Sequence, residues 1–364
     1  MKTVLHTESS TGLGGQEVRT LTEARWIAER GWRVVLAGQP GAAFTERARQ
    51  RGIEAIEVSM RGAWDVRAVS RLVRLIGDED VSLVHTHSSV DGWVAGLAAR
   101  IARVPVVRTR HVSIRIRRRL NPVYRWLADR VITSGEAIRG IVVASGVPAG
   151  RVVAVPAGVD LAEIDRAGNA PDVLRQSLGL GRPVIGSVAM FRGSKGHAHL
   201  LGAFAMVRER WPTARLLLVG DGIRRPWVEG LARDRGMGDA VVFTGFRSDV
   251  FELLRIMDCF VLASTRTEGV PQSLLQAFAA RVPTVASAVG GIPEVVTDKE
   301  TGLLVTPEDP TALARGIEAV LDDPAGAAER AAAARRLVEA RFSHSVSVSR
   351  LLAVYESLLP RGEA

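Results

Sequence analysis

Two short segments in the second half of the chain carry residues suited to binding a phosphorylated, hydroxyl-rich ligand. The segment 191-FRGSKGH-197 places Arg192 and Lys195 in one glycine-rich turn that opens a helix. A forked guanidinium, an ammonium and backbone amides at a helix N-terminus together suit a diphosphate. The segment 267-TEGVPQSLLQAF-278 places Glu268 in a loop before another helix. A carboxylate there can accept hydrogen bonds from sugar hydroxyls.

Each segment also has a purely structural interpretation. A basic turn can occur without a ligand, and an acid before a helix can simply cap its N-terminus. Pro271 falls in the first turn of the predicted helix, where proline is tolerated. Leu274, Leu275 and Phe278 follow the spacing of a helix face that packs into a core. The turn at 191–197 lacks the Walker A pattern, so ATP hydrolysis is not indicated.

The first loop of the chain, 8-ESSTGLGGQE-17, is rich in glycine and follows a predicted strand. Gly14 and Gly15 would let backbone amides approach an anionic ligand at a helix N-terminus. A nicotinamide dinucleotide site would need an acid at the end of the next strand, but 36-LAGQP-40 has none. A glycine-rich turn without any ligand is the alternative.

The histidines near two other strand ends are further candidates. His85 and His87, in 84-VHTHSS-89, would share one face if the strand continues that far. A metal site would need a third ligand, and the chain has one cysteine and no His-Glu-x-x-His motif, so we expect no metal. His111, in 109-TRHVS-113, follows the next strand, where a ligand-binding residue should lie. A histidine satisfied within the fold is the alternative.

These candidates lie after strands in a regular alternation of strand and helix patterns. Short apolar runs without alternation are typical of strands buried on both faces of a parallel sheet. The alternation predicts an α/β protein with doubly wound sheets. The predicted strands are 2–7, 32–38, 53–58, 81–86, 104–109, 130–134, 151–156, 183–189, 214–220, 240–245, 258–264, 282–287 and 302–306.

The alternation stalls at 160–183, which we interpret as a linker between two domains. We expect Rossmann-like domains at 1–165 and 166–344, with a last helix at 345–359 that packs back on the first. Such domains would face a deep cleft. Ligands of these folds bind at the carboxyl ends of the strands, so the candidate residues should line that cleft.

Composition narrows the function classes. The chain of 364 residues is 47% hydrophobic and lacks a membrane-spanning run or a signal-peptide pattern, so we expect a cytoplasmic protein. The net charge is +9, and residues 1–165 hold 24 Lys and Arg against 17 Asp and Glu. The block 108-RTRHVSIRIRRRLNPVYR-125, from Arg108 to Arg125, is either a solvated face or a contact for an anionic membrane or acidic acceptor. Nucleic acid is not expected, because stacking aromatics and known binding motifs are missing.

Taken together, the motifs resemble those of family 4 glycosyltransferases with the GT-B architecture, over essentially the full length. Each motif alone is weak, but the ordered set is specific. The matching segments are 14-GGQE-17, 109-TRHVS-113, 134-SGEAIR-139, 155-VPAGVD-160, 195-KG-196, 219-VGDG-222, 244-TGFRSDV-250, 268-EGVPQSLLQA-277 and 290-GGIPEVV-296.

The resemblance implies a retaining transfer from a nucleotide diphosphate sugar without a metal or other cofactor. The second domain would bind the donor and the first the acceptor. The implied catalytic residues are His111, Arg192, Lys195 and Glu268. The implied donor-binding residues are Gly14, Gly15, Arg192, Lys195, Gly245, Phe246, Glu268, Gly269, Val270, Pro271 and Gln276, with the base near Gly245 and Phe246. His87, Ser88 and Arg110 are expected on the acceptor side.

Two positions depart from the family pattern. The usual arginine lies five residues before Lys195, where this chain has Met190, so the phosphate role of Arg192 is inferred from its reach. Gln276 stands where the family has a second glutamate that contacts ribose. Its amide can still exchange hydrogen bonds with a hydroxyl, but it loses charge assistance of ~1 kcal/mol.

The sequence thus predicts a retaining glycosyltransferase acting on a glycan, lipid-linked or other hydroxyl acceptor. The basic first domain favours a lipid-linked or anionic acceptor at the inner face of the cytoplasmic membrane. Two alternatives stay open at this point. One is a sugar-nucleotide epimerase on the same fold, and the other is a non-catalytic protein that binds membrane surfaces.

Overall fold

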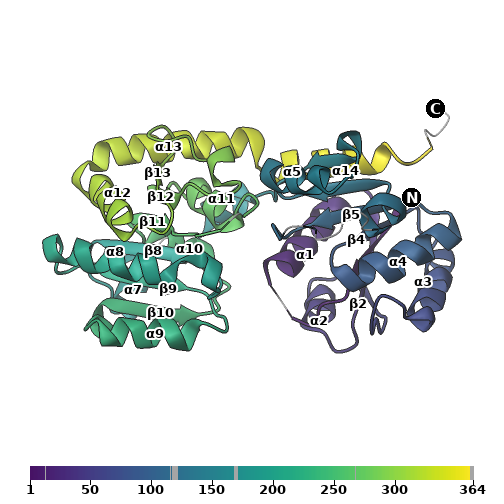
Figure 1. Ribbon diagram of the computed structural model, residues 1–364, viewed down its shortest axis with the longest axis horizontal. Coiled ribbons are helices and arrows are strands. Elements are labelled where there is room, and N and C mark those ends of the chain that lie inside the picture. The colour runs from purple at the N-terminus through teal and green to yellow at the C-terminus, as the bar shows by residue number, and fades with distance from the viewer. Residues whose placement is uncertain (13, 115, 117–121, 168–170, 267, 361–364) are drawn as a thin grey trace. The chain divides into compact units, whose positions relative to one another are not determined.

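The chain folds into two compact units, each built on one parallel sheet (Figure 1). The first unit combines Met1–Ala157 with His344–Ala364, and the second comprises Gly158–Ser343. The computed structural model describes residues 1–12, 14–114, 116, 122–167, 171–266 and 268–360. The two Rossmann-like domains of the predicted fold are therefore confirmed.

The first unit contains a sheet whose seven described strands run in the order β3-β2-β1-β4-β5-β6-β7. Neighbouring strands pair in parallel throughout. The central strands β1 and β4 are completely buried, which explains their lack of polar-apolar alternation. The strands are β1 (Thr3–Glu8), β2 (Arg33–Gly38), β3 (Glu54–Glu57), β4 (Leu83–Thr86), β5 (Val106–Arg110), β6 (Arg130–Thr133) and β7 (Val152–Ala154).

The helices of the first unit cover both faces of this sheet. They are α1 (Gly15–Ala28), α2 (Ala43–Gln50), α3 (Val66–Asp78), α4 (Ser89–Ala102), the π-helix η1 (Val123–Leu127), α5 (Glu136–Ala144), the 3₁₀ turn η2 (Ala149–Arg151) and α14 (His344–Glu356). Helix α2 was not predicted, because its sequence AFTERARQ offers few apolar residues and buries only Phe44, Thr45 and Ala48. The C-terminal helix α14 packs on α1, and its Tyr355 is fully buried.

The second unit contains a parallel sheet of six described strands in the order β10-β9-β8-β11-β12-β13. These are β8 (Val184–Val188), β9 (Arg215–Val219), β10 (Val241–Gly245), β11 (Cys259–Leu262), β12 (Thr284–Ser287) and β13 (Leu303–Val305). Its longer helices are α6 (Leu161–Arg166), α7 (Pro171–Ser177), α8 (His197–Arg210), α9 (Arg225–Asp234), α10 (Val250–Arg255), α11 (Gln272–Ala279), α12 (Pro310–Asp322) and α13 (Pro324–Arg341). The 3₁₀ turns are η3 (Gly193–Lys195), η4 (Gly238–Ala240) and η5 (Ile292–Glu294).

The segment interpreted as a linker contains the helices α6 and α7, and it belongs to the second unit. Ile164 of α6 is buried in the core of that unit. Asp165 forms an ion pair with Arg335 of α13 at 2.8 Å. These contacts place the division of the chain at Ala157, earlier than the boundary expected at residue 165. Such long-range contacts leave no local signal in the sequence.

Close packing of α12 on the second sheet requires a glycine in the helix. A Cβ atom added at Gly316 would lie 2.8 Å from a methyl group of Val285 and 3.1 Å from one of Val305. Both valines are strand residues of the sheet below. In contrast, a Cβ atom added at Gly140 in α5 would meet no atom within 4 Å.

We therefore expect opposite effects from the same substitution in two helices. Gly316→Ala should destabilise the protein by about 1–3 kcal/mol, because the methyl group overpacks the helix–sheet contact. The control Gly140→Ala should stabilise it by about 0.5–1 kcal/mol, because alanine favours an open helix position. Urea unfolding of both variants measures the difference, and a stabilised Gly316→Ala protein would contradict the proposed packing constraint.

Candidate active site

In the second unit, the predicted charged residues lie at the topological switch point of the sheet, where the order in which successive strands are added changes direction. Strand β8 is followed in sequence by β9 on one side, whereas β11 lies on the other side of β8. Loops that leave neighbouring strands in opposite directions open a ligand-binding crevice between them. Lys195 follows β8 and Glu268 follows β11, and the Lys195 Nζ to Glu268 Oε2 distance is 2.7 Å. The fold thus joins two residues that are far apart in sequence.

The turn that carries Lys195 is fixed by a very close backbone approach. Gly196 has φ +66°, and a Cβ atom there would lie 1.8 Å from the carbonyl oxygen of Ala263. The amide of Thr265 also donates to the carbonyl of Ser194 at 2.9 Å. A side chain at residue 196 would therefore push the turn away from the loop after β11.

The loop that carries Glu268 is held from two sides. Ser264 donates its hydroxyl hydrogen to Oε1 of Glu268, which leaves Oε2 for Lys195. The amide of Gly291 donates to the carbonyl oxygen of Glu268 at 2.9 Å. A Cβ atom at Gly291 would lie 2.7 Å from the carbonyl carbon of Gly269, so the 290-GGIPEVV-296 motif forms a close backbone support. The Glu268 side chain remains 14% exposed and that of Lys195 22%.

Arg192 occupies a different position from Lys195. Its exposed side chain lines a pocket of about 160 Å³ at the N-terminus of α8, together with Arg224 and Trp227. Helix N-termini and arginines both favour phosphate. The sequence analysis missed Arg224, since it follows no motif that points to a ligand. The structure therefore brings Lys195 together with Glu268, and Arg192 together with Arg224.

The remaining predicted donor residues of this unit lie on β10, on α11 and in the loop before α11. Gly245 ends β10 with φ +72°, and the ring of Phe246 beside it is 61% exposed. Val270 and Pro271 are buried, and Pro271 forms the N-cap of α11. Gln276 is half-buried on α11. Leu274, Leu275 and Phe278 are fully buried, which confirms the predicted core face. The roles of these residues in donor binding remain predictions.

In the first unit, the corresponding switch point in strand order lies between β1 and β4. The loops after these strands meet where the hydroxyl oxygens of Ser9 and Ser88 approach to 2.5 Å. The adjacent Gly14 is the N-cap of α1, and its amide donates to Oε2 of Glu17 at 2.7 Å. This capping contact already uses the Gly14 amide. Of the two predicted glycines, Gly15 is therefore the better placed to donate its amide hydrogen to a ligand.

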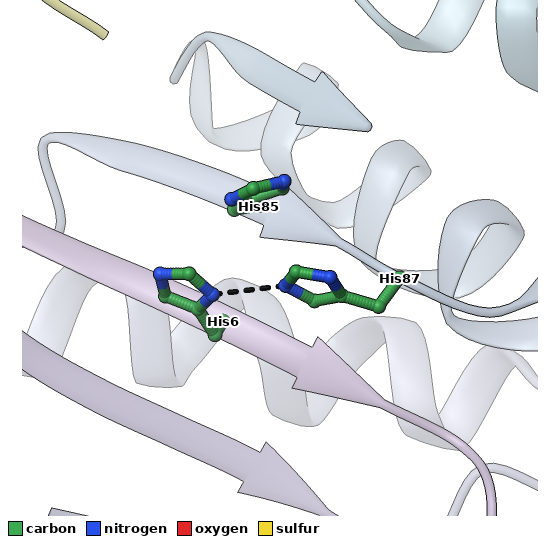
Figure 2. A group of neighbouring side chains, drawn as sticks. All are labelled: His6, His85 and His87. Carbon is green, nitrogen blue, oxygen red and sulfur yellow. Dashed lines mark hydrogen bonds between the residues drawn. The ribbon is translucent and has the colours of Figure 1, made fainter. Parts of the chain in front are cut away.

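Four histidines and one tyrosine form a connected cluster beneath this loop. Figure 2 shows three of them, His6 from β1 and His85 and His87 from β4 and its end. The Nδ1 atom of His6 lies 2.9 Å from Nε2 of His87, and Nδ1 of His87 lies 3.2 Å from Nε2 of His111. His6, His85 and His87 are buried, and His111 is half-buried. Burial lowers the pKa of His6 to about 3 and holds the pKa of the other three well below 6.5.

The structure supplies the third histidine that a metal site would need. Among the described residues, His6, His85 and His87 could together hold a metal, with one nitrogen from each within 4.8 Å of the others. Sequence analysis missed His6 because only strand pairing places it opposite His85. However, both ring nitrogens of all three have hydrogen-bond partners within the protein. The arrangement therefore fits a hydrogen-bonded cluster better than a metal centre.

The acceptor-side candidates and part of the basic block are more covered than expected. His87 is 2% exposed and Arg110 is 9% exposed, whereas Ser88 is half-buried. Arg108 donates to the carbonyl of Ser88 at 2.7 Å, and Arg110 donates to the Tyr124 hydroxyl at 2.8 Å. For these two arginines, both the solvated face and the contact with an anionic membrane or acceptor were wrong, because both side chains are buried and bridge elements inside the unit. Residues 115 and 117–121 of the block lie outside the described residues.

Glu8 is a buried acid that the sequence analysis did not select. It accepts hydrogen bonds from the Gln16 side chain at 2.5 Å and from the Ser10 amide at 2.9 Å. Burial, with a smaller contribution from the charge of Asp91, raises the pKa of Glu8 to about 7. Glu8 is the last residue of β1, and its bond to Gln16 of α1 places a titrating carboxyl at the start of the glycine-rich loop.

This raised pKa predicts a pH-dependent stability difference. Above about pH 4.5 the unfolded chain loses the Glu8 proton, whereas the folded protein keeps it until about pH 7. The contribution of Glu8 to wild-type stability therefore declines as pH rises through this window. Glu8→Gln should gain stability relative to wild type by about 1 kcal/mol per pH unit between about pH 5 and pH 7. Urea unfolding at each pH measures it, and a difference independent of pH would contradict the buried-acid interpretation.

Comparison with known proteins identifies the family of this chain. The family model described as glycosyl transferases group 1 matches residues 172–337, and that described as glycosyltransferase family 4 matches residues 13–163. The 2-deoxystreptamine glucosyltransferase of Streptomyces kanamyceticus is 30% identical, with 94% of this chain and 99% of the relative covered. The UDP-Gal:alpha-D-GlcNAc-diphosphoundecaprenol alpha-1,3-galactosyltransferase of Escherichia coli is 28% identical over 71% of each chain.

Solved structures show the same fold. The crystal structure of Anabaena Alr3699/HepE in complex with UDP-glucose has a TM-score of 0.87 at 22% identity, covering 98% of this chain and all of the other. A glycosyltransferase from Rickettsia africae also gives a TM-score of 0.87, at 22% identity and with 98% of each chain covered. With one family model on each unit and full-length relatives, the chain belongs to the family 4 glycosyltransferases of GT-B fold and is a glycosyltransferase enzyme.

Proposed function

We propose that this enzyme moves a sugar from a nucleotide diphosphate sugar to a hydroxyl acceptor, with retention of the anomeric configuration and without a metal. The observation that carries the proposal is the contact between Lys195 and Glu268 at the β8/β11 crevice. A cation for phosphate and an acid for sugar hydroxyls stand side by side there, at the position where the two halves of such a donor would be joined.

The names of relatives support a nucleotide-sugar donor without selecting one. One relative is named as GDP-mannose-dependent and another as using UDP-Gal. The Anabaena structures contain UDP or UDP-glucose. Phe246 is an exposed ring beside Gly245, where a base could stack.

In the proposed reaction, the bond between the anomeric carbon and the phosphate oxygen breaks and the acceptor oxygen bonds to the same face of the sugar. The leaving phosphate takes the proton of the acceptor hydroxyl, so no separate carboxylate base is required. Lys195 and Arg192, with the N-terminus of α8, would stabilise the charge that develops on the diphosphate. Glu268 would then be released from Lys195 to bind sugar hydroxyls, and His111 would contact the transferred sugar.

For the acceptor, we propose a glycan or lipid-linked hydroxyl compound. The Escherichia coli relative is named for a diphosphoundecaprenol-linked acceptor. Ile114, in the described part of the basic block, is 70% exposed, and Trp126, the residue directly after the block, is 62% exposed. Exposed apolar side chains beside arginines suit contact with an anionic membrane surface. No helix in the described residues is long and apolar enough to cross a bilayer.

A transfer assay with site variants tests the proposal. Thermal stabilisation by UDP-, GDP-, ADP- and CMP-sugars identifies the donor, because a ligand that binds the native state raises its stability. With that donor, Lys195→Ala and Glu268→Ala should each reduce kcat/KM on the order of 100-fold, because the leaving group or sugar loses its partner. The control Arg210→Ala removes an exposed ion pair with Asp322 and should retain full activity.

The same assay tests whether the transfer retains the anomeric configuration and whether it needs a metal. The product should keep the anomeric configuration of the donor by NMR, and EDTA should not reduce the rate. Wild-type turnover by both variants, with the fold intact by circular dichroism, would refute the site assignment. An isomerised sugar nucleotide formed without acceptor would instead support the epimerase alternative.

Gln276 offers a test by gain of function. Gln276→Glu should tighten donor binding about fivefold, corresponding to ~1 kcal/mol, because a charged carboxylate accepts a stronger hydrogen bond from a ribose hydroxyl. Isothermal titration with the donor measures the change, and the deoxyribose form of the same donor should show a smaller gain. Equal or weaker binding of both donors would contradict the ribose assignment.

A further inference from the structure

The histidine cluster of the first unit forms a single hydrogen-bonded chain from β5 to His111. Thr109 Oγ1 lies 2.6 Å from Nε2 of His85, and Nδ1 of His85 lies 2.6 Å from the Tyr355 hydroxyl. The same hydroxyl lies 3.3 Å from Nε2 of His6. From His6 the chain continues through His87 to His111 at 2.9 and 3.2 Å. Each histidine before His111 is engaged through both ring nitrogens.

Such a chain can carry its hydrogens in only two consistent ways. A neutral imidazole donates from one nitrogen and accepts at the other, and the Tyr355 hydroxyl has one hydrogen to share between two histidines. Each member that donates forward must therefore accept from behind. The hydrogens point either all toward His111 or all toward Thr109. In the first case His111 is protonated on Nδ1, and in the second on Nε2.

Thr20 distinguishes the two directions. Its hydroxyl lies 3.0 Å from the carbonyl oxygen of Gln16, one turn earlier in α1. A carbonyl can only accept, so the single hydroxyl hydrogen of Thr20 is used there. Thr20 Oγ1 also lies 3.4 Å from Nδ1 of His87 and can only accept from it. His87 must then carry its hydrogen on Nδ1, which sets the direction of the whole chain.

We propose that Thr20 is a positioning residue that orients this chain so that His111 is a neutral histidine protonated on Nδ1, with its bare Nε2 held by His87. At Nδ1, His111 can then donate a hydrogen bond to a ligand but cannot accept one. If His111 contacts the transferred sugar, which rests on the proposed function, it presents a fixed donor to a sugar hydroxyl there. It does not act as a base at that nitrogen.

The surroundings keep the chain neutral. His6, His85 and His87 are buried, and burial disfavours a proton on each histidine of the cluster. The cation Arg19 further disfavours a proton on His87, and Arg19 and Arg108 disfavour one on His111. The acids around the cluster are engaged elsewhere. Glu23 pairs with Arg19 at 2.7 Å, Asp91 accepts from Thr7 and the His87 amide, and Glu8 accepts from Gln16 and Ser10. A second proton on His111 would face the Nδ1 hydrogen of His87, so protonation breaks the chain.

A metal ion is the competing explanation for three clustered histidines. Zinc requires bare nitrogens at about 2.0–2.1 Å from one centre. Here Nδ1 of His6 and Nε2 of His87 face each other at 2.9 Å, the distance of a hydrogen bond. A metal would have to displace hydrogen bonds at all three rings.

Nitrogen NMR of histidine-labelled protein tests the proposal without any ligand. In wild type at neutral pH, His111 should give one tautomer, with Nδ1 in the protonated and Nε2 in the unprotonated shift range. Thr20→Val removes the fixing contact but keeps the side-chain shape, so His111 should show both tautomers, with a several-fold rise in the Nε2-protonated form. Thr20→Ser keeps the hydroxyl and should restore the wild-type spectrum.

The chain offers a matched control. Thr22 in the same helix makes the same kind of bond, to the Val18 carbonyl at 2.8 Å, but makes no hydrogen bond to the cluster in the described structure. Thr22→Val should leave the His111 signals unchanged, which separates the role of Thr20 from general helix effects. An Nε2-protonated His111 in wild type, an unchanged spectrum in Thr20→Val, or a bound stoichiometric metal would each overturn the proposal.

Transfer kinetics then distinguish this inference from the proposed function. With an active donor, Thr20→Val should lower kcat/KM about fivefold because the donor hydrogen is present only part of the time. If the tautomers behave as expected but no sugar nucleotide binds or reacts, the proposed function fails and the hydrogen-bonded chain stands. If transfer is found but His111 has mixed tautomers in wild type, the function stands and the inference about Thr20 fails.

Discussion

Each parallel sheet has a switch point at which the order of successive strands changes direction, and the candidate site depends on this constraint. In the second unit, β8 and β11 are neighbours whose following segments leave toward opposite sides of the sheet. The loops at this point are therefore available to a ligand rather than covered by a crossover helix. Backbone contacts of Gly196 with Ala263 and of Gly291 with Gly269 then bring these loops close enough for Lys195 to reach Glu268.

The same constraint yields different chemistry in the first unit. The reversal between β1 and β4 gathers uncharged histidines, two serine hydroxyls and a buried acid, rather than a half-buried ion pair. Burial penalises charge, so groups in this position are stable as neutral donors and acceptors. The loops of the second unit thus hold an ion pair, whereas the corresponding position in the first unit offers directional hydrogen bonds from neutral histidines.

The C-terminal helix connects the end of the chain to this polar cluster. Residues of α14 pack with α1 in the first unit, and the Tyr355 hydroxyl bridges His85 and His6. A hydroxyl is well suited to this place because it accepts one hydrogen bond while donating another. The helix therefore does more than cover apolar surface, since without its hydroxyl the two histidines would have unsatisfied buried nitrogens.

The sequence by itself determined the alternation of strands and helices, the two Rossmann-like folds and the core face of α11, because these follow from local hydrophobic patterns. It also singled out Lys195 and Glu268 by motif. Only the tertiary structure decided that these two touch, that His6 joins His85, and that Arg108 and Arg110 are buried. Such facts depend on strand order and on contacts between residues distant in sequence, which leave no periodic trace in the chain.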